Sequence, residues 1–146
     1  MTKIVVFDVD GTLANNDHRS HWVKTKPKNW KAFHKGTPHD TPYPEVVDIA
    51  QTYNEKGAII VICSAREEIH REATQEWLIR HEIPFDALYM RPKNDYRDDA
   101  IIKIELLEKI RKDYGEPFMW FDDRNKVVDA LRANGVKVLQ VRPGDF

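Results

Sequence analysis

Short apolar runs alternate with amphipathic stretches along most of the chain, and this alternation restricts the fold more than any other feature of the sequence. The apolar runs are rich in β-branched residues and match buried strands: 4–7, 58–63, 118–121, 136–141 and, more weakly, 87–90. The stretches between them repeat apolar residues at helical spacing: 43–55, 67–81, 98–113 and 125–134. Strands that alternate with helices form a parallel sheet through right-handed crossovers. The sequence therefore predicts an α/β fold, a Rossmann-like parallel sheet with helices on both faces.

The length of 146 residues fits a single domain over 1–146. The segment 15–41 lacks a strand pattern, and we expect it to form a small cap-like insertion after the first strand, folded over the edge of the sheet. Cys63 is the only cysteine, which excludes a disulfide framework and favours a cytoplasmic setting. We expect no signal peptide and no membrane partner, because no apolar run approaches the roughly 20 residues that span a bilayer.

Acidic residues stand directly after the first predicted strand, in the segment Asp8-Val9-Asp10-Gly11-Thr12. In open α/β sheets the ligand site lies beyond the carboxyl ends of the strands. Turn chemistry explains the pair Asp10-Gly11, because Asp-Gly is common in turns. It does not explain Asp8, an acid that closes a fully apolar strand. The placement therefore predicts a functional site built on Asp8 and Asp10.

A second acidic pair, Asp122-Asp123, ends the apolar run 118–121 in the same way. Adjacent carboxylates repel each other unless a cation or an arginine compensates, although one of them could instead cap the next helix. If the strands are parallel, this pair converges with Asp8 and Asp10 at one edge of the sheet. A cluster of oxygen donors without cysteine binds a hard cation, and Mg²⁺ fits best.

Ser64 and Lys103 are candidates for contacts with a phosphoryl group. The hydroxyl of Ser64 follows the second apolar run, where it can donate to a phosphoryl oxygen or cap the helix expected to start near Glu67. Lys103 stands near the start of the predicted helix 98–113, where the helix dipole disfavours a cation. It either forms a weak surface ion pair with Asp99, four residues earlier on the same helical face, or neutralises phosphate charge.

In this order along the chain, the set Asp8-x-Asp10-Gly11-Thr12, Ser64, Lys103 and Asp122-Asp123 resembles the haloacid dehalogenase superfamily of phosphohydrolases. A closer resemblance is to the 3′-phosphatase domains of the bacteriophage polynucleotide kinase-phosphatase family. It rests on Arg19, Ser64-Ala65-Arg66, the segment 99–103, Asp122-Asp123-Arg124 and the ending Gly144-Asp145-Phe146. The resemblance covers essentially the whole chain. The sequence has no Gly-x-x-x-x-Gly-Lys-Ser/Thr loop, so the kinase half of that family is absent from it.

The resemblance implies a Mg²⁺-dependent phosphomonoesterase that acts through an aspartyl-phosphate. Asp8 would be the nucleophile and Asp10 the general acid and base, so the two carboxylates need different environments. The metal would be held by Asp8, the backbone carbonyl of Asp10, Asp122 and, directly or through water, Asp123. Ser64 and Lys103 would hold phosphate oxygens as part of the catalytic set. The substrate-binding residues would be Arg19, Arg66, Thr12, Asp99 and Arg124.

The segment 17–40 bears on the substrate. The net charge of −1 argues against a polybasic protein, but this segment is locally basic, with Arg19, Lys24, Lys26, Lys28, Lys31 and Lys35 against only Asp17 and Asp40. Trp22, Trp30 and Phe33 are interleaved, and cations with aromatic faces are how single-stranded nucleic acid is held. The same aromatic residues could instead pack the insertion onto the sheet.

The resemblance favours the 3′-phosphate at a nucleic-acid end as the substrate, in nucleic-acid end repair inside a bacterial cytoplasm. One alternative is a phosphatase for mononucleotides or another small phosphoester. Another, of a different class, is a nucleic-acid-binding module that has lost catalysis. A kinase or ligase partner on a separate chain is left open.

Overall fold

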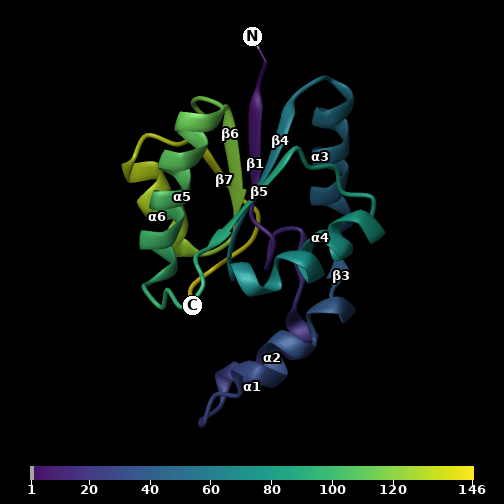
Figure 1. The fold of residues 1–146 in the computed structure, drawn as a ribbon, viewed down its shortest axis with the longest axis vertical. Coiled ribbons are helices and arrows are strands. Elements are labelled where there is room, and N and C mark those ends of the chain that lie inside the picture. Colours follow the sequence, from purple (N-terminus) through teal and green to yellow (C-terminus); the bar gives the residue numbers. More distant parts are fainter. Residues whose placement is uncertain (1) are drawn as a thin grey trace.

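A five-stranded parallel sheet forms the centre of the molecule in the computed structural model, which describes residues 2–146 (Figure 1). The strands are β1 (Ile4–Phe7), β4 (Ile59–Glu67), β5 (Ala87–Arg91), β6 (Met119–Asp122) and β7 (Val138–Gln140). Their order across the sheet is β5-β4-β1-β6-β7, and every neighbouring pair is parallel. The predicted α/β architecture is therefore confirmed.

Helices cover both faces of the sheet, as the alternation predicts. Helices α3 (Pro44–Glu55) and α4 (Arg71–Arg80) pack on one face, and α5 (Asp99–Asp113) and α6 (Asn125–Ala133) on the other. Because side chains alternate along a strand, β1 sends Val5 and Phe7 into the first core and Ile4 and Val6 into the second. Within residues 2–146, no helix is both long and apolar enough to cross a lipid bilayer.

The insertion after β1 is a helical hairpin that projects from the sheet (Figure 1). It contains β2 (Ala14–Asn15), α1 (Asp17–Lys24), α2 (Trp30–Lys35), the 3₁₀ turn η1 (Thr37–His39) and β3 (Thr41–Pro42). The prediction that this segment lacks strands was wrong at its two ends, where β2 and β3 pair antiparallel. Two residues are too few to show a strand pattern in the sequence.

The region after β4 also differs from the prediction. The strand extends to Glu67 instead of ending at 63, because Ser64 and Glu67 continue the ladder with β5 around a bulge. A 3₁₀ turn, η2 (Glu68–His70), follows, so α4 begins at Arg71 and not near Glu67. Ser64 therefore lies within a strand, and the alternative that it caps a helix was wrong.

Candidate active site

Three buried carboxylates meet where β1 and β6 end. Asp8 directly follows β1, Asp122 is the last residue of β6, and Asp123 follows it. Each offers an oxygen atom, and these atoms lie within 4.8 Å of one another. The two strands are hydrogen-bonded neighbours, and the Asp8 amide donates to the carbonyl of Phe121 at 3.0 Å. The predicted convergence is confirmed for Asp8 but not for the side chain of Asp10, and the three clustered side chains could hold a metal ion.

Lys103 of α5 places its ammonium among these carboxylates. Its Nζ donates to Asp8 Oδ1 and to Asp122 Oδ2, each at 2.9 Å. The side chain is 2% exposed and does not contact Asp99, so the predicted alternative of a surface ion pair was wrong. Burial alone would lower the pKa of Lys103. The charges of Asp122 and Asp8 outweigh burial and raise this pKa well above its usual value, so the ammonium stays charged.

One ammonium does not balance three carboxylates. Burial raises the pKa of Asp8 well above its usual value, and the charge of Asp122 adds to this, while Lys103 acts in the opposite direction. Burial and Asp122 likewise raise the pKa of Asp123 to about 6. A cation bound among the carboxylates would lower these pKa values, because it favours the charged form.

Asp10 lies in a different environment, between two arginines. Arg66 of β4 donates from Nε and Nη2 to both carboxylate oxygens, at 2.9 and 2.8 Å. Arg19 of α1 donates to Asp10 Oδ1 at 2.8 Å and also binds both oxygens of Asp40 at 2.8 Å. Burial raises the pKa of Asp10, but Arg66 and Arg19 outweigh it and hold the pKa well below its usual range.

Asp8 and Asp10 thus differ in environment, as the sequence analysis requires. Burial and Asp122 raise the pKa of Asp8, a shift that a bound cation would oppose, whereas Arg66 and Arg19 lower the pKa of Asp10. The arginines were expected to grip the substrate. In the structure both are buried and hold Asp10, and Asp40 completes this cluster.

Two predicted hydroxyl groups are buried, one in the loop after β1 and one in β4. Thr12 Oγ1 donates to Asp8 Oδ2 at 3.1 Å. Ser64 is buried, and its Oγ accepts from the backbone N–H of Arg66 at 3.1 Å. Neither acid of the second pair caps the following helix, because Arg124 occupies the N-cap of α6 without a side-chain cap. The carboxylates of Asp122 and Asp123 are thereby left to the site.

Asp99 lies between two arginines at the edge of the site. It accepts from Arg124 Nη1 at 2.7 Å, and Arg91 binds its other oxygen. Arg91 also donates to the backbone carbonyls of Ala65 and Arg97, so it ties β4 and β5 to the start of α5. The sequence analysis did not identify Asp40 as part of the site. The signal for Asp40 was its place as one of only two acids in a basic segment.

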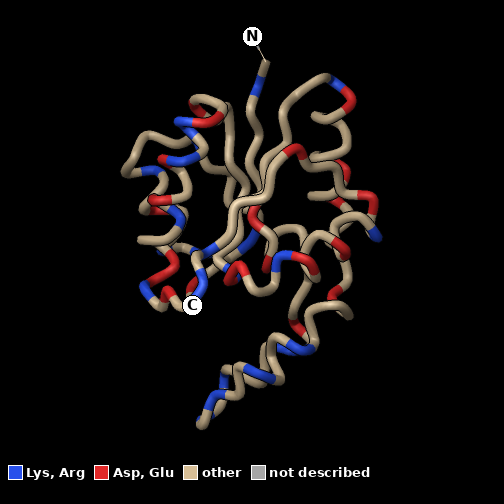
Figure 2. Tube along the Cα trace, in the orientation of Figure 1, with Lys and Arg blue, Asp and Glu red and all other residues tan. Residues whose placement is uncertain are grey.

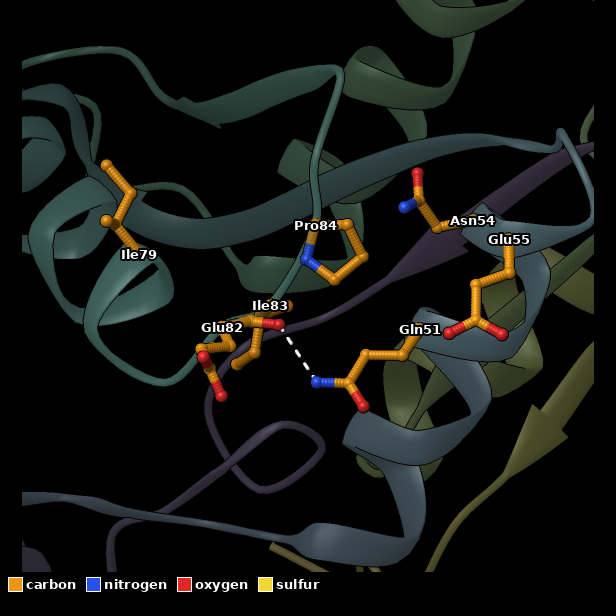
Figure 3. Close-up of a pocket in the computed structure, with 7 residues that line it drawn as sticks. All are labelled: Gln51, Asn54, Glu55, Ile79, Glu82, Ile83 and Pro84. Atoms are coloured by element: carbon orange, nitrogen blue, oxygen red, sulfur yellow. Dashed lines mark hydrogen bonds between the residues drawn. The ribbon is translucent and has the colours of Figure 1, made fainter.

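A surface hollow elsewhere in the molecule shares no residue with this site. It lies between α3 and the turn after α4, and its lining includes Gln51, Ile79 and Pro84 (Figure 3). The side chain of Gln51 closes one end by donating to the carbonyl of Glu82 at 3.0 Å. No cluster of titratable groups faces this hollow comparable to that around Asp8.

Comparisons with known proteins agree with this geometry. A family model described as the phosphatase domain of polynucleotide kinase PNKP matches residues 2–146. A chain in a structure of a Pnkp1/Rnl/Hen1 RNA repair complex is 33% identical, with a TM-score of 0.85 over 100% of this chain and 44% of that one. A haloacid dehalogenase-like protein from Streptococcus pneumoniae shares the fold alone, at 14% identity and a TM-score of 0.67 over 95% and 84% of the two chains.

A viral protein is also similar to this chain. A candidate bifunctional polynucleotide kinase/RNA ligase of Autographa californica nuclear polyhedrosis virus is 28% identical over 128 residues. The match covers 86% of this chain and 17% of the viral protein. The chain described here therefore spans less than half the length of these two relatives.

Proposed function

The chain belongs to the family of polynucleotide kinase phosphatase domains, which are phosphoric monoester hydrolases of the haloacid dehalogenase type, and we propose that it is a Mg²⁺-dependent polynucleotide 3′-phosphatase. One observation carries the proposal. Asp8 lies among acids that suit a hard cation, while Asp10, two residues on, has its own pair of arginines. The nucleophile and the proton-transfer group of a phosphomonoesterase need this separation.

The cation site fits magnesium by its donors, since three carboxylate oxygens and no thiol surround it. Asp8, Asp122, Asp123 and the backbone carbonyl of Asp10 would hold the ion, which would ionise Asp8 and offset its repulsion from the phosphate. Thr12 and Lys103 orient the Asp8 carboxylate through the contacts described above. With its position fixed in this way, Asp8 Oδ attacks phosphorus in line with the ester bond.

The phosphoryl group moves in two steps. In the first, a bond forms between Asp8 and phosphorus, the bond from phosphorus to the 3′ oxygen breaks, and Asp10 donates its proton to that oxygen. In the second, Asp10 takes a proton from a water molecule as the water oxygen bonds to phosphorus and the bond between phosphorus and Asp8 breaks, which releases phosphate. The substrate dianion raises the pKa of Asp10 and competes with it for Arg19 and Arg66. This competition supplies the protonated acid that the arginines otherwise disfavour.

Ser64 and Lys103 are assigned to the oxygens of the transferred phosphate, because Lys103 donates to Asp8 and Ser64 is buried in β4, the strand next to β1. Substrate contacts of Thr12, Asp99 and Arg124 stay predictions. Thr12 donates to Asp8, and Asp99 pairs with Arg124 and Arg91.

The insertion supports a polynucleotide as substrate. Trp22 and Trp30 are 41% and 52% exposed, and the Lys28 ammonium lies 5.7 Å from the Trp30 ring centre. Figure 2 shows lysines and arginines along this hairpin with few acids. Phe33 differs, because it packs beneath Arg19 at 4.3 Å and so supports the core of the insertion. Exposed aromatic faces among lysines suit the bases and phosphates of a single strand.

The relatives suggest the setting of the reaction. One belongs to an RNA repair complex, and the viral one is described as kinase and ligase. We infer that this chain prepares 3′ ends for joining, and that kinase or ligase activity comes from another domain or chain. The buried thiol of Cys63, whose pKa burial raises to about 12, is compatible with a reducing cytoplasm.

The test is phosphate release with Mg²⁺ from three substrates: a 3′-phosphorylated oligonucleotide, a 3′-mononucleotide and a 5′-phosphorylated oligonucleotide. We expect the first to be preferred, and Asp8→Asn to abolish release from all three because the nucleophile is lost. Asp129→Asn, an exposed acid on α6, is the matched control. Equal rates on 3′ and 5′ ends would overturn the 3′ assignment, and preference for the mononucleotide would favour a nucleotidase.

A further inference from the structure

Arg142 differs from the other cations that contact the loops of the site. Among these side chains in residues 2–146, Arg142 alone forms no ion pair. Asp10 and Asp40 pair with Arg19 and Arg66, Asp8 and Asp122 pair with Lys103, and Asp99 pairs with both Arg91 and Arg124. An arginine with no carboxylate partner retains its full capacity for an anion.

Two contacts hold this guanidinium in place. Its Nε donates to the carbonyl of Gly11 at 2.6 Å, and its central carbon lies 3.4 Å from the centre of the Tyr43 ring. Neither contact uses the two Nη groups, which donate to no acceptor within residues 2–146. No buried side-chain nitrogen in residues 2–146 lacks a partner, so each Nη group of the half-buried Arg142 is at least partly exposed. Arg142 therefore presents a fixed pair of donors outward.

The position of this pair is set by the loops that carry the acids. Gly11 follows Asp10, has φ +80°, and leaves no room for a side chain, since a Cβ atom would lie 1.9 Å from Asp123 Oδ2. The segment that carries Arg142 is tied to the same acids. Gln140 Nε2 donates to the carbonyl of Asp123 at 2.9 Å, and a Cβ at Gly144 would lie 1.8 Å from that carbonyl. Arg142 cannot move far without disturbing both loops.

The chemistry of the free donors suits a phosphodiester. A guanidinium fork matches two oxygens of a phosphate, and charge-assisted pairs of this kind are stronger than neutral hydrogen bonds. The transferred phosphate already has Lys103, Ser64, Arg19 and Arg66 as proposed partners. Arg142 binds the Gly11 carbonyl and belongs to none of these pairs, so it is available for another phosphate of the same strand.

We propose that Arg142 binds the phosphodiester that precedes the 3′-terminal phosphate, and thereby makes the enzyme favour a strand end over a mononucleotide. The proposal rests on the proposed function and deepens it. It assigns the recognition of polymer to a single fixed cation beside the catalytic loop, in addition to the insertion. The tyrosine beneath the guanidinium acts as a positioning residue, because its ring supports the plane of the fork.

The test compares two 3′-phosphorylated dinucleotides, one with its natural internal linkage and one in which that linkage is a neutral methylphosphonate. We expect the neutral linkage to lower kcat/KM of the unaltered protein about tenfold, and to have little effect in Arg142→Ala. Arg142→Ala should also lose more activity on the natural dinucleotide than on the 3′-mononucleotide. Arg132→Ala, which removes an arginine that binds the carbonyl of Val138, is the matched control.

Two results would overturn the proposal: equal sensitivity to the neutral linkage with and without Arg142, or equal losses on dinucleotide and mononucleotide. The second result would mean that Arg142 acts only through the Gly11 loop. Arg142→Lys keeps the charge without the fork and should retain part of the sensitivity, so it serves if Arg142→Ala fails to fold. If the unaltered protein hydrolyses p-nitrophenyl phosphate but no 3′-phosphorylated substrate, the proposed function itself is wrong.

Discussion

Asp8 and Asp10 are two residues apart in the chain, yet they belong to clusters with opposite electrical character. Around Asp8, three carboxylates share one lysine, and burial raises the pKa values of Asp8 and Asp123. Around Asp10, two carboxylates face two arginines, and the pKa of Asp10 is lowered. The first cluster is short of positive charge and needs a cation to be stable with all its acids ionised. The second is complete within the protein.

In the proposed reaction, this contrast separates the nucleophile from the group that transfers the proton. An unbalanced cluster binds a cation strongly, because the cation relieves repulsion between buried acids. A balanced cluster holds its acid in a defined position and resists displacement until another anion arrives. A loop of five residues, 8–12, thus contributes one acid to a cluster suited to a cation and another acid to a cluster that fixes its position.

Removing Lys103 should have the largest effect, because it deepens the imbalance around Asp8. We expect Lys103→Met to lower the free energy of unfolding in chelator by about 3–5 kcal/mol, since buried charges lose their partner. Mg²⁺ should restore a large part of this loss, which urea unfolding with and without the ion would measure. Lys109→Met, an exposed lysine on the same helix, is the control. Equal stability of the two variants would contradict the contrast.

The two clusters should also respond to pH in opposite directions. Asp123 has a raised pKa of about 6, so folding favours its protonated form, and its contribution to stability is lost as pH rises from about 4 to 6. Asp10 has a lowered pKa, so its contribution is present above about pH 4 and is lost on acidification. The raised pKa of Asp123 corresponds to a change of at most about 3 kcal/mol.

Stability in chelator at several pH values measures this response. Relative to Asp123→Asn, the unaltered protein should become less stable between pH 4 and 6, and Mg²⁺ should cancel that trend. Relative to Asp10→Asn, the unaltered protein should become more stable as pH rises toward about 4. Parallel curves for all three proteins would remove the electrostatic distinction between the clusters.

The smallest expected effects come from a matched pair of threonines, one in each cluster. Thr12 donates to Asp8, and Thr74 accepts from Arg66 Nη1 at 3.0 Å. Thr12→Val loses one hydrogen bond and should cost about 1 kcal/mol in urea unfolding. Thr74→Val should cost about 2 kcal/mol, because Thr74 also donates to the carbonyl of His70. Only Thr12→Val should weaken Mg²⁺ binding, by a fewfold in titration calorimetry, because Thr74 touches no acid of the cation cluster. Equal weakening by both variants would show that the clusters are coupled.

The unbalanced cluster could be predicted from sequence because it depends on backbone topology. Asp8 and Asp122 close strands that the apolar runs already identify, and parallel neighbours bring their ends together. The helices over Pro44–Glu55, Asp99–Asp113 and Asn125–Ala133 were close to prediction for a similar reason, since each repeats apolar residues at a helical period.

The balanced cluster was less visible because its contacts join distant segments. Arg66 lies 56 positions from Asp10, and nothing local in the sequence pairs them. Local reasoning also paired Lys103 with Asp99, four residues away, whereas the buried Asp8, 95 positions away, is its partner. The predicted strand ended too early, at 63, because the polar residues Ser64 and Arg66 interrupt the apolar run. In the structure, β4 continues through both residues and ends at Glu67.

The short pair of β2 and β3 gives the insertion the form of an exchangeable module. Residues 16–40 leave and re-enter the domain at adjacent points, so a different hairpin could be grafted there without altering the central sheet. Such a graft would not be free of constraints. Arg19 and Asp40 lie within the exchanged segment, and both help to hold Asp10. Any replacement would therefore have to carry its own arginine and acid in the same places, however different its outer surface.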